Sequence, residues 1–435
     1  MTVEEIYAKF INGSDEKYDL EDDTFLISTD MDRSSLSKMI NELLNLENQV
    51  SFDIIIHNNR LRTTVSEVLE ELNIQSESTI EVLYVLTISE PSENTLDKLD
   101  DWISGLSYDK ISDISAVCCY NGRVSLYRSE TMEKVHNFTN QSSKSSVCIT
   151  TNKSNPEFTE LICGTFNGLV EVYYVNSKVK TPLNTLVASN NAVSDTVNSV
   201  TVEDSCKVIA SGGYDNLITL YQNVEMLDEE LLNSKSNKRT LHETKTLTQL
   251  GSLANHTKPI TRLKFYPYKN ETLLSSSIDG KLCVWDIEKK SLISSHNTGN
   301  AVTCFDISPN GNMVCTGTLS GSLTIWDLNS ENTSVSLNSP QEHSYNFAKV
   351  SQSMQFDRLV SDISWNPSNN LISSISLDGS VILLDVRSPK FPLQTVNCKD
   401  GEESDRGTCT RWTSSKEIIY TTASGLVNKL KYKEI

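Results

Sequence analysis

Hydrophobic and polar positions follow two different spacings along the first 90 residues, which predicts both strands and helices there. Apolar runs of strand length lie at 4–11 (EEIYAKFI), 24–29 (TFLIST), 52–56 (FDIII) and 80–87 (IEVLYVLT). Helical spacing instead relates two sets of apolar residues: Leu36, Met39, Ile40, Leu43 and Leu44, and then Val65, Val68, Leu69 and Leu72. This order predicts an α+β domain of the ubiquitin-like β-grasp type over residues 1–88, although ferredoxin-like arrangements use similar elements.

The pattern changes after this domain. Residues 89–101 lose periodicity and gain Pro, Ser, Asn and acidic residues, which predicts an acidic linker. From Trp102 onward, short β-rich runs return every 40–60 residues or so, as expected for a repeat protein. Two of the units, at 256–286 and 301–327, end in Trp-Asp. Weaker copies can be aligned at 114–128, 160–174, 208–222, 371–385 and 418–432.

Seven copies with a Trp-Asp signature predict a seven-bladed WD40 β-propeller over residues 102–435, so the whole chain should be mainly β. The last copy ends after its third strand at Tyr432, three residues from the end of the sequence. We therefore expect the missing outer strand to come from residues 102–106 (WISGL). Two long insertions, at 222–255 and 329–360, are predicted to leave the ring as loops.

Candidate catalytic chemistry is limited to residues of one repeat. His256, Asp279 and a serine among 275–277 include the residue types of a catalytic triad, with Trp285 close by. In WD repeats the same residue types form a structural hydrogen-bonded tetrad, and we predict that role here. The sequence has no phosphate-binding glycine loop, no metal-ligand spacing among its histidines and no Cys-x-x-Cys pair. It therefore predicts a protein that is not an enzyme and that holds no metal or cofactor of its own.

The acidic residues are concentrated in the N-terminal domain. Residues 1–90 contain 6 Lys and Arg against 19 Asp and Glu, about two thirds of the net charge of −19. Such a domain repels phosphates, so we expect direct RNA binding not to dominate. It suits docking on a basic or metal-bearing partner, although a merely soluble face has the same composition. Within it, Glu77 stands between Ser76 and Ser78 in a polar segment that a partner could approach closely. No apolar stretch is long enough for a membrane span, so we expect no membrane partner.

Three segments carry a family resemblance: FDIIIHNNRLRTTVSEVL (52–69), QSESTIEVLY (75–84) and LDDWISGL (99–106). Together with the domain order, they make the chain similar to the WD-repeat ribosome-biogenesis proteins of the PeBoW complex, the yeast Ytm-type family. The resemblance covers essentially the whole chain. It implies a non-catalytic assembly factor for the large (60S) ribosomal subunit and for rRNA maturation, acting in the nucleolus and nucleoplasm.

The resemblance also implies partners. The propeller would bind a Bop/Erb-type propeller protein, which in turn holds a Pescadillo-type protein. The ubiquitin-like domain would dock on the AAA ATPase midasin, whose ATP-driven pull releases the complex from the pre-60S particle. Family members complete the metal coordination of midasin's adhesion site with a Glu. That Glu corresponds to Glu77, which would share a Mg²⁺ held by the partner, an ion that prefers oxygen ligands.

Two alternative functions stay open at this stage. A Notchless-type factor also joins a ubiquitin-like domain to a propeller and docks on midasin, but it has eight blades and a longer chain. A WD adaptor of a ubiquitin ligase would use the N-terminal domain as a ubiquitin mimic, with a hydrophobic patch on its sheet. Glu71 and Glu81 are the competing acidic residues if the alignment at Glu77 is shifted.

Overall fold

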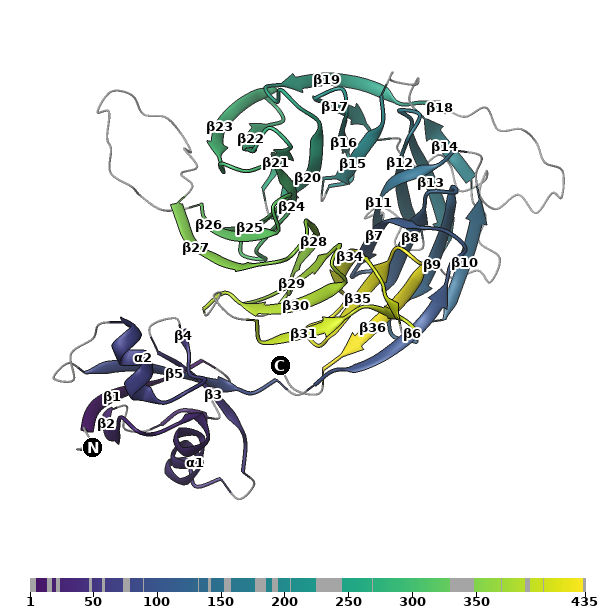
Figure 1. The fold of residues 1–435 in the computed structure, drawn as a ribbon. Helices are drawn as coiled ribbons and strands as arrows, with labels where there is room; N and C mark the ends of the chain where they lie inside the picture. Colours follow the sequence, from purple (N-terminus) through teal and green to yellow (C-terminus); the bar gives the residue numbers. More distant parts are fainter. Residues whose placement is uncertain are drawn as a thin grey trace, which may run out of the picture.

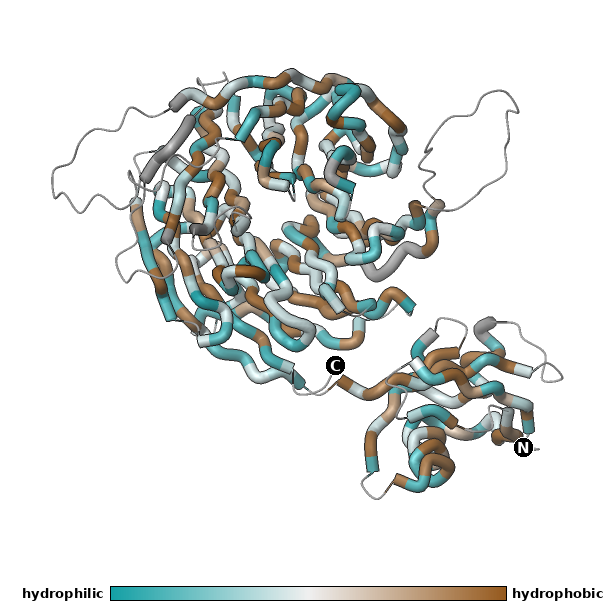
Figure 2. Tube along the Cα trace, turned by 180° about the vertical axis from the view of Figure 1, so that it is seen from behind, coloured by the Kyte–Doolittle hydropathy of each residue, from teal (hydrophilic) through white to brown (hydrophobic). Residues whose placement is uncertain are grey.

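The protein consists of a small α+β domain joined to a ring of β-sheets (Figure 1). It is seen in a computed structural model, which describes residues 5–13, 18–20, 24–46, 49–56, 59–72, 79–88, 90–131, 133–139, 142–151, 158–176, 185–189, 195–203, 205–223, 245–267, 269–328, 348–368, 370–387, 392–401 and 403–432. In both domains hydrophobic and hydrophilic stretches alternate along the strands (Figure 2). No helix in the described part of the chain is long and apolar enough to cross a membrane.

The N-terminal domain is a five-stranded sheet with two helices. Its sheet order is β2-β1-β5-β3-β4, with β1 parallel to β5 and the other pairs antiparallel. The elements are β1 (Glu5–Asn12), β2 (Thr24–Ser28), α1 (Arg33–Leu43), β3 (Phe52–Ile56), β4 (Asn59–Arg60), α2 (Val65–Leu72) and β5 (Ile80–Leu86). Asp32 caps α1 by accepting a hydrogen bond from the Ser35 N–H. This is the predicted β-grasp arrangement.

Seven of the remaining sheets among the described residues are blades, six of four strands and one with a short fifth strand, which confirms the predicted propeller. Blade 1 contains β7 (Ile103–Asp109), β8 (Ile114–Cys119), β9 (Arg123–Arg128) and β10 (Lys134–Thr139). Blade 2 contains β11 (Lys144–Thr151), β12 (Phe158–Thr165), β13 (Val170–Asn176) and β14 (Thr185–Ser189), with the short β18 (Lys245–Thr246) added parallel to β14. Blade 3 contains β15 (Val197–Val202), β16 (Val208–Gly213), β17 (Leu217–Gln222) and β19 (Thr248–Ala254).

The second half of the ring follows the same order. Blade 4 contains β20 (Ile260–Tyr266), β21 (Lys269–Ser277), β22 (Lys281–Asp286) and β23 (Ser291–Asn297). Blade 5 contains β24 (Val302–Ile307), β25 (Met313–Thr318), β26 (Ser322–Asp327) and β27 (Ala348–Gln355). Blade 6 contains β28 (Val360–Trp365), β29 (Leu371–Ser376), β30 (Ser380–Asp385) and β31 (Gln394–Asn397). The hairpin β32 (Lys399–Asp400) and β33 (Glu403–Ser404) leads to blade 7, with β34 (Gly407–Trp412), β35 (Glu417–Thr422), β36 (Leu426–Lys431) and β6 (Ser92–Lys98).

The hydrophobic core of the ring lies between neighbouring blades. One cluster, for example, joins Leu220 of blade 3 to Leu263 and Trp285 of blade 4. A single four-stranded blade cannot bury both of its faces, so each blade depends on its neighbours. The first strand of each blade faces the central channel, and the fourth lies at the outer rim.

Ring closure differs from the sequence prediction. The strand that completes blade 7 is β6, which pairs antiparallel with β36 from Ser92↔Lys431 to Lys98↔Leu426. It lies inside the segment 89–101 that was predicted to be a linker, so that prediction was wrong for residues 92–98. Residues 102–106, expected to be the closing strand, instead begin the inner strand of blade 1, β7. The connector between the two domains is therefore only the few residues from 87 to 91.

The two predicted insertions extend too far at their C-terminal ends. Residues 245–254 hold β18 and β19, and residues 348–355 form β27, so the outer strands of blades 3 and 5 lie inside the two segments. These strands were missed because rim strands show weak alternation: β19 is exposed at most positions. The central parts of both insertions, 224–244 and 329–347, lie outside the described residues.

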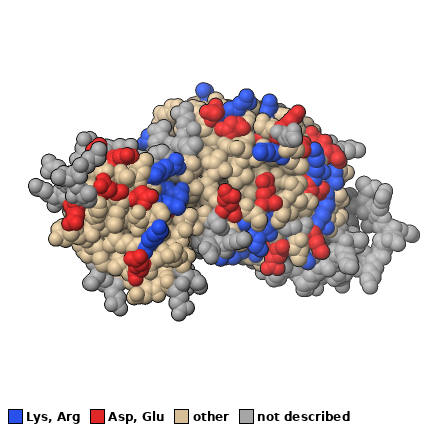
Figure 3. All heavy atoms as spheres, turned by 60° about the horizontal axis from the view of Figure 1, so that its bottom comes forward, with Lys and Arg blue, Asp and Glu red and all other residues tan. Residues whose placement is uncertain are grey.

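The N-terminal domain contacts blade 6 through two arginines that are each held by a buried carboxylate. Arg60, paired with Asp53, donates to the carbonyl of Leu393 over 3.4 Å. Arg387, paired with Asp385, donates in the opposite direction to the carbonyl of Gly13 over 2.5 Å. In the space-filling view, Lys and Arg side chains gather where the two domains meet (Figure 3). Each domain thus holds a backbone carbonyl of the other.

Candidate interaction sites

The residue proposed to reach a partner metal, Glu77, lies outside the described residues, as does all of 73–78. The flanking elements place this segment between the end of α2 at Leu72 and the start of β5 at Ile80. Of the two competing acidic residues, Glu71 belongs to the last turn of α2. Glu81 is exposed on β5, directly opposite Lys9 of β1.

The structure brings His256, Asp279 and Trp285 together through Ser275, at the edge of blade 4. The His256 Nδ1 lies 3.1 Å from the Asp279 Oδ2, and its Nε2 lies 2.8 Å from the Ser275 Oγ. The Trp285 Nε1–H donates to the same Oγ over 2.8 Å. Because the Ser275 hydroxyl is buried and bonded to both rings, it has no access to a substrate. The arrangement ties the loop before β20 to the middle strands of the blade, as a structural tetrad does.

Burial lowers the pKa of the His256 imidazole below its usual value of 6.5, although Asp279 acts in the opposite direction. Burial also raises the pKa of the Asp279 carboxyl, but hydrogen bonds from the N–H groups of Thr257 and Lys281 outweigh this, and its pKa is lowered overall. At neutral pH the tetrad therefore holds a neutral imidazole beside an ionised carboxylate.

These shifts predict how stability depends on pH. The unfolded chain takes up a proton on His256 as the pH falls below about 6.5, while the folded chain resists it. The contribution of His256 is therefore fully present above pH 6.5 and is lost as the pH falls, by at most about 1.4 kcal/mol per pH unit. Urea unfolding of wild type and His256→Gln between about pH 5 and 7.5 measures it. We expect a shallower slope for the variant, and parallel curves would contradict the assignment.

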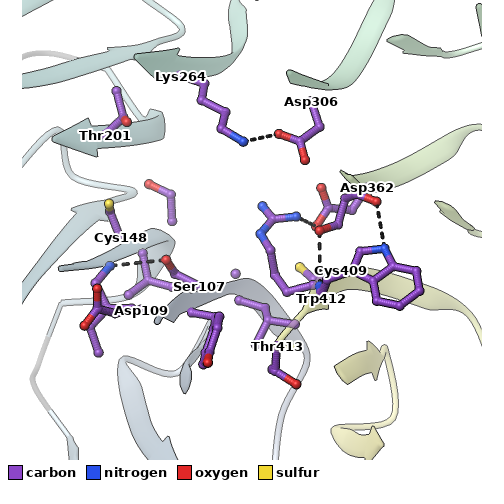
Figure 4. A pocket seen from close by; sticks show the side chains of 18 of the residues that line it. Ser107, Asp109, Cys148, Thr201, Lys264, Asp306, Asp362, Cys409, Trp412 and Thr413 are labelled. Carbon is purple, nitrogen blue, oxygen red and sulfur yellow. Dashed lines mark hydrogen bonds and ion pairs between the residues drawn. The ribbon is translucent and has the colours of Figure 1, made fainter. Parts of the chain in front are cut away.

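The central channel contains a network of charged side chains from four consecutive blades (Figure 4). The Asp362 carboxylate receives the Arg262 Nη1 at 2.5 Å and the Arg411 Nη1 at 2.9 Å. One blade earlier, Asp306 pairs with Lys264 and accepts the Trp365 N–H at 2.7 Å. Burial raises the pKa of the Asp362 carboxyl to about 6, against the lowering effect of Arg262. The network links blades 4 to 7 around the ring.

The channel has a volume of about 990 Å³, but two of the carboxylates that line it are already bonded to other groups of the protein. The carboxylates of Asp306 and Asp362 already bind cations and backbone N–H groups of the protein. No group of three or more His, Cys, Asp or Glu that could hold a metal occurs among the residues that the structure describes. The carboxylates of Asp306 and Asp362 thus serve contacts within the protein that link neighbouring blades.

The cysteines do not form a nucleophilic or disulfide site. All ten are free, and eight are buried. Burial raises the pKa of the thiols of Cys148, Cys163 and Cys304 to about 12. A thiol must ionise to act as a nucleophile, so these groups pack as small hydrophobic residues.

Sequence reasoning placed no residue on a protein-binding face of the propeller, but the structure shows one candidate. Four exposed aromatic residues lie at one end of blades 1 to 3: Trp102, Tyr120, Phe166 and Tyr214. We call this set the aromatic row. Single exposed hydrophobic residues are ordinary, whereas neighbouring ones mark interaction surfaces. The available signal was an aromatic residue in each turn between the second and third strands of these blades.

Comparisons with known proteins agree with this architecture. Residues 6–69 match the NLE (NUC135) domain model, and residues 247–286, 288–327 and 352–385 match the model for the WD domain, G-beta repeat. The chain is therefore a WD-repeat protein with an N-terminal NLE domain. WD-repeat proteins of this kind generally act as scaffolds rather than enzymes.

The homologues that align along most of the chain are named ribosome biogenesis protein YTM1 or WDR12. The ytm1 protein of Pyrenophora tritici-repentis is 24% identical over 404 residues, covering 88% of this chain and 84% of its own. The WDR12 homolog of Nematostella vectensis is 24% identical over 431 residues, covering 96% and 97%. The YTM1 protein of Vanderwaltozyma polyspora is 25% identical over 447 residues, covering 94% and 93%. These relatives imply a ribosome biogenesis factor.

Proposed function

We propose that this protein is a non-catalytic assembly factor of the large ribosomal subunit, which works by joining two partners. Its propeller binds a Bop/Erb-type protein, and through it a Pescadillo-type protein, on the pre-60S particle in the nucleolus and nucleoplasm. Its N-terminal domain docks on the AAA ATPase midasin, which pulls the complex off the particle. The observation that carries the proposal is the domain pair itself, a β-grasp sheet fused to a seven-bladed ring, aligned with YTM1 and WDR12 relatives over nearly the whole chain.

The scaffold role is supported by the way the polar groups of the ring are used. The tetrad of blade 4 and the ion network of the channel bond to the protein itself, so their function is to hold blades together. The exposed aromatic row leaves apolar surface for a protein partner. The short connector and the two arginine contacts with blade 6 suit a domain that transmits a pull to the ring.

The docking role of the N-terminal domain rests on Glu77. We propose that its carboxylate completes the coordination of a Mg²⁺ held by midasin, which supplies the other oxygen ligands. A segment between a helix end and a strand start is a suitable place to present one side chain, and its sequence neighbours Ser76 and Ser78 are small residues. The chain itself would contribute a single ligand.

The test is a binding assay between the full chain and the isolated adhesion domain of midasin, with Mg²⁺ or with EDTA. We expect Glu77→Ala to lose the Mg²⁺-dependent part of the affinity, by about tenfold or more, equivalent to about 1.4 kcal/mol. Glu77→Asp keeps the charge but shortens the reach, so we expect an intermediate loss. Glu81→Ala, exposed on the neighbouring strand, is the matched control and should bind normally. Normal binding by folded Glu77→Ala would exclude the assignment.

The structure bears on both alternatives. A Notchless-type factor calls for eight blades, whereas the described residues form seven. The ligase-adaptor alternative calls for an apolar patch on the β-grasp sheet, and one is present: Tyr7 and Leu26 are exposed cross-strand neighbours, 59% and 47% accessible. Co-purification of ligase subunits with wild type, lost in Tyr7→Ser/Leu26→Ser, would favour the adaptor. We expect no such subunits, and midasin binding should survive that double substitution.

A further inference from the structure

The aromatic row is built from turns that are far apart in the sequence. Trp102 precedes β7, Tyr120 follows β8, Phe166 follows β12 and Tyr214 follows β16. The last three turns connect the second and third strands of blades 1, 2 and 3, so they lie at the same end of consecutive blades. The four side chains are 49%, 40%, 37% and 57% exposed, respectively. Large aromatic residues at the tips of neighbouring blades expose apolar surface at one end of the ring.

Hydrogen bonds and ring contacts hold this surface in one arrangement. The Tyr120 N–H donates to the Trp102 carbonyl over 3.1 Å. The rings of Tyr120 and Phe166 pack across the blade boundary, with centroids 5.1 Å apart. Thr196 then joins blades 2 and 3, because its hydroxyl donates to the Phe166 carbonyl over 3.1 Å while its own carbonyl accepts the Tyr214 N–H over 3.0 Å. Aromatic anchors held in place lose little entropy on binding.

Acidic residues border the row at both ends. Asp100 and Asp101 precede Trp102, and the Asp100 carboxylate is 81% exposed, although Arg123 approaches it at 2.8 Å. At the other end, Asp215 follows Tyr214, and Asp195 precedes Thr196. Burial raises the pKa of the Asp215 carboxyl, and the nearby charge of Asp195 raises it further. Within the described ranges, neither Asp195 nor Asp215 forms an ion pair, so this end carries negative charge without a compensating cation.

We propose that the aromatic row is the docking surface for a basic segment of a protein partner, one in which arginines stand beside apolar residues. Aromatic faces attract cations, and Trp and Tyr do so most strongly. Arginine suits the site better than lysine, since its planar guanidinium stacks on a ring while its N–H groups reach a carboxylate. A nucleic acid could stack on the same rings, but its phosphates would meet Asp100, Asp195 and Asp215. The inference rests on the proposed function in one respect, since it gives the chemistry of the propeller's partner.

The test uses the full-length chain and a labelled 12-residue peptide of alternating Arg and Ala, with binding followed by fluorescence anisotropy at about 150 mM salt, where exposed charges are screened beyond about 8 Å. Two double variants test the aromatic rings and the carboxylates of the surface separately. Trp102→Ala/Tyr214→Ala keeps the net charge, and Asp195→Asn/Asp215→Asn keeps the rings. We expect each to weaken binding about tenfold, because rings and carboxylates act on the same guanidinium groups. A Lys-Ala peptide should bind more weakly than the Arg-Ala peptide.

Controls separate this site from general attraction to an acidic protein. Tyr7→Ala removes an exposed aromatic residue from the N-terminal domain, and Glu81→Gln removes an exposed carboxylate from the same domain, so both should bind within twofold of wild type. Equal binding by all variants, an effect of the Asp pair without the aromatic pair, or tighter binding of a 12-nucleotide RNA would each overturn the proposal. The Glu77 assay with midasin is independent of these variants, so failure here leaves the docking role of the N-terminal domain intact, and the reverse also holds.

Discussion

Replacing Asp362 by Ala is expected to lower the free energy of unfolding of the propeller by about 3–5 kcal/mol, the range for removing one partner of a buried ion pair. Asp362 is 2% exposed and binds Arg262 and Arg411, one from blade 4 and one from blade 7. It also accepts the N–H groups of Ile363 and Thr410. Without the carboxylate, the Arg262 guanidinium and two backbone donors lose their partner together.

Two matched variants separate the effect of the buried ion pair from that of losing any carboxylate. Asp362→Asn keeps the volume and one acceptor oxygen and removes a charge that burial disfavours, since burial raises the pKa of this carboxyl to about 6. We expect it to cost less than the Ala variant. Asp100→Ala removes an exposed carboxylate, also paired with an arginine, and should stay within about 0.5 kcal/mol of wild type. Urea unfolding followed by tryptophan fluorescence compares the three, and equal midpoints for Asp362→Ala and Asp100→Ala would contradict a structural role for the network.

The parts of the fold that could be predicted from the sequence are those with a local signature. Blades 4 and 5 show a strand, a turn and a closing Trp-Asp within about 30 residues, and the Trp285 signature led to its tetrad partners His256 and Asp279. The N-terminal helices were predicted in the same way, because α1 buries Leu36 and Ile40 on one face. In these segments the spacing of apolar residues within a single strand or helix is enough to show which side is buried.

The closing strand could not be found in this way. β6 has the sequence SENTLDK and is exposed or half-buried at every position. An outer strand at the rim of a ring has little core to face, so its hydrophobic pattern disappears while its backbone pairing remains. Its partner, β36, lies more than 300 residues further along the chain. Residues 102–106, which were predicted to close the ring, have a clearer apolar pattern because they begin β7, the strand that faces the channel.

The channel network was missed for a related reason. Arg262, Asp306, Asp362 and Arg411 come from four blades, and 100 residues separate Arg262 from Asp362. One signal was available, since Asp306, Asp362 and Arg411 each stand as the single charged residue of an otherwise apolar or small-residue inner strand, and Arg262 shares its strand only with Lys264. A charge in such a strand is expensive unless it is paired, so its presence predicts a partner. The identity of that partner follows only from the ring.

Removing β6 is expected to open the ring, and two truncations separated by one strand test this. A chain of residues 92–435 keeps β6 and should melt within about 3 °C of the full-length protein's propeller transition. A chain of residues 99–435 loses the pairing with β36. It also loses two hydrogen bonds between Asp97 and blade 1. The Asp97 carboxylate accepts from the Tyr127 hydroxyl at 2.8 Å and from the Lys134 ammonium at 2.6 Å. At about 1 kcal/mol for each of about five hydrogen bonds, the loss of about 5 kcal/mol should lower the melting temperature of a domain of this size by about 7 °C.

The shorter chain should also self-associate, because β36 becomes an unprotected edge strand with free N–H and C=O groups. Differential scanning calorimetry and light scattering measure the two effects. A third chain restores the strand elsewhere: residues 99–432 followed by a flexible linker and residues 92–98. If β6 acts through its pairing with β36, this chain should recover both the melting temperature and the monomeric state, since Ser92 pairs with Lys431 and a short linker can join the two strands as a hairpin. Equal stability of the 92–435 and 99–435 chains would show instead that the ring closes without β6.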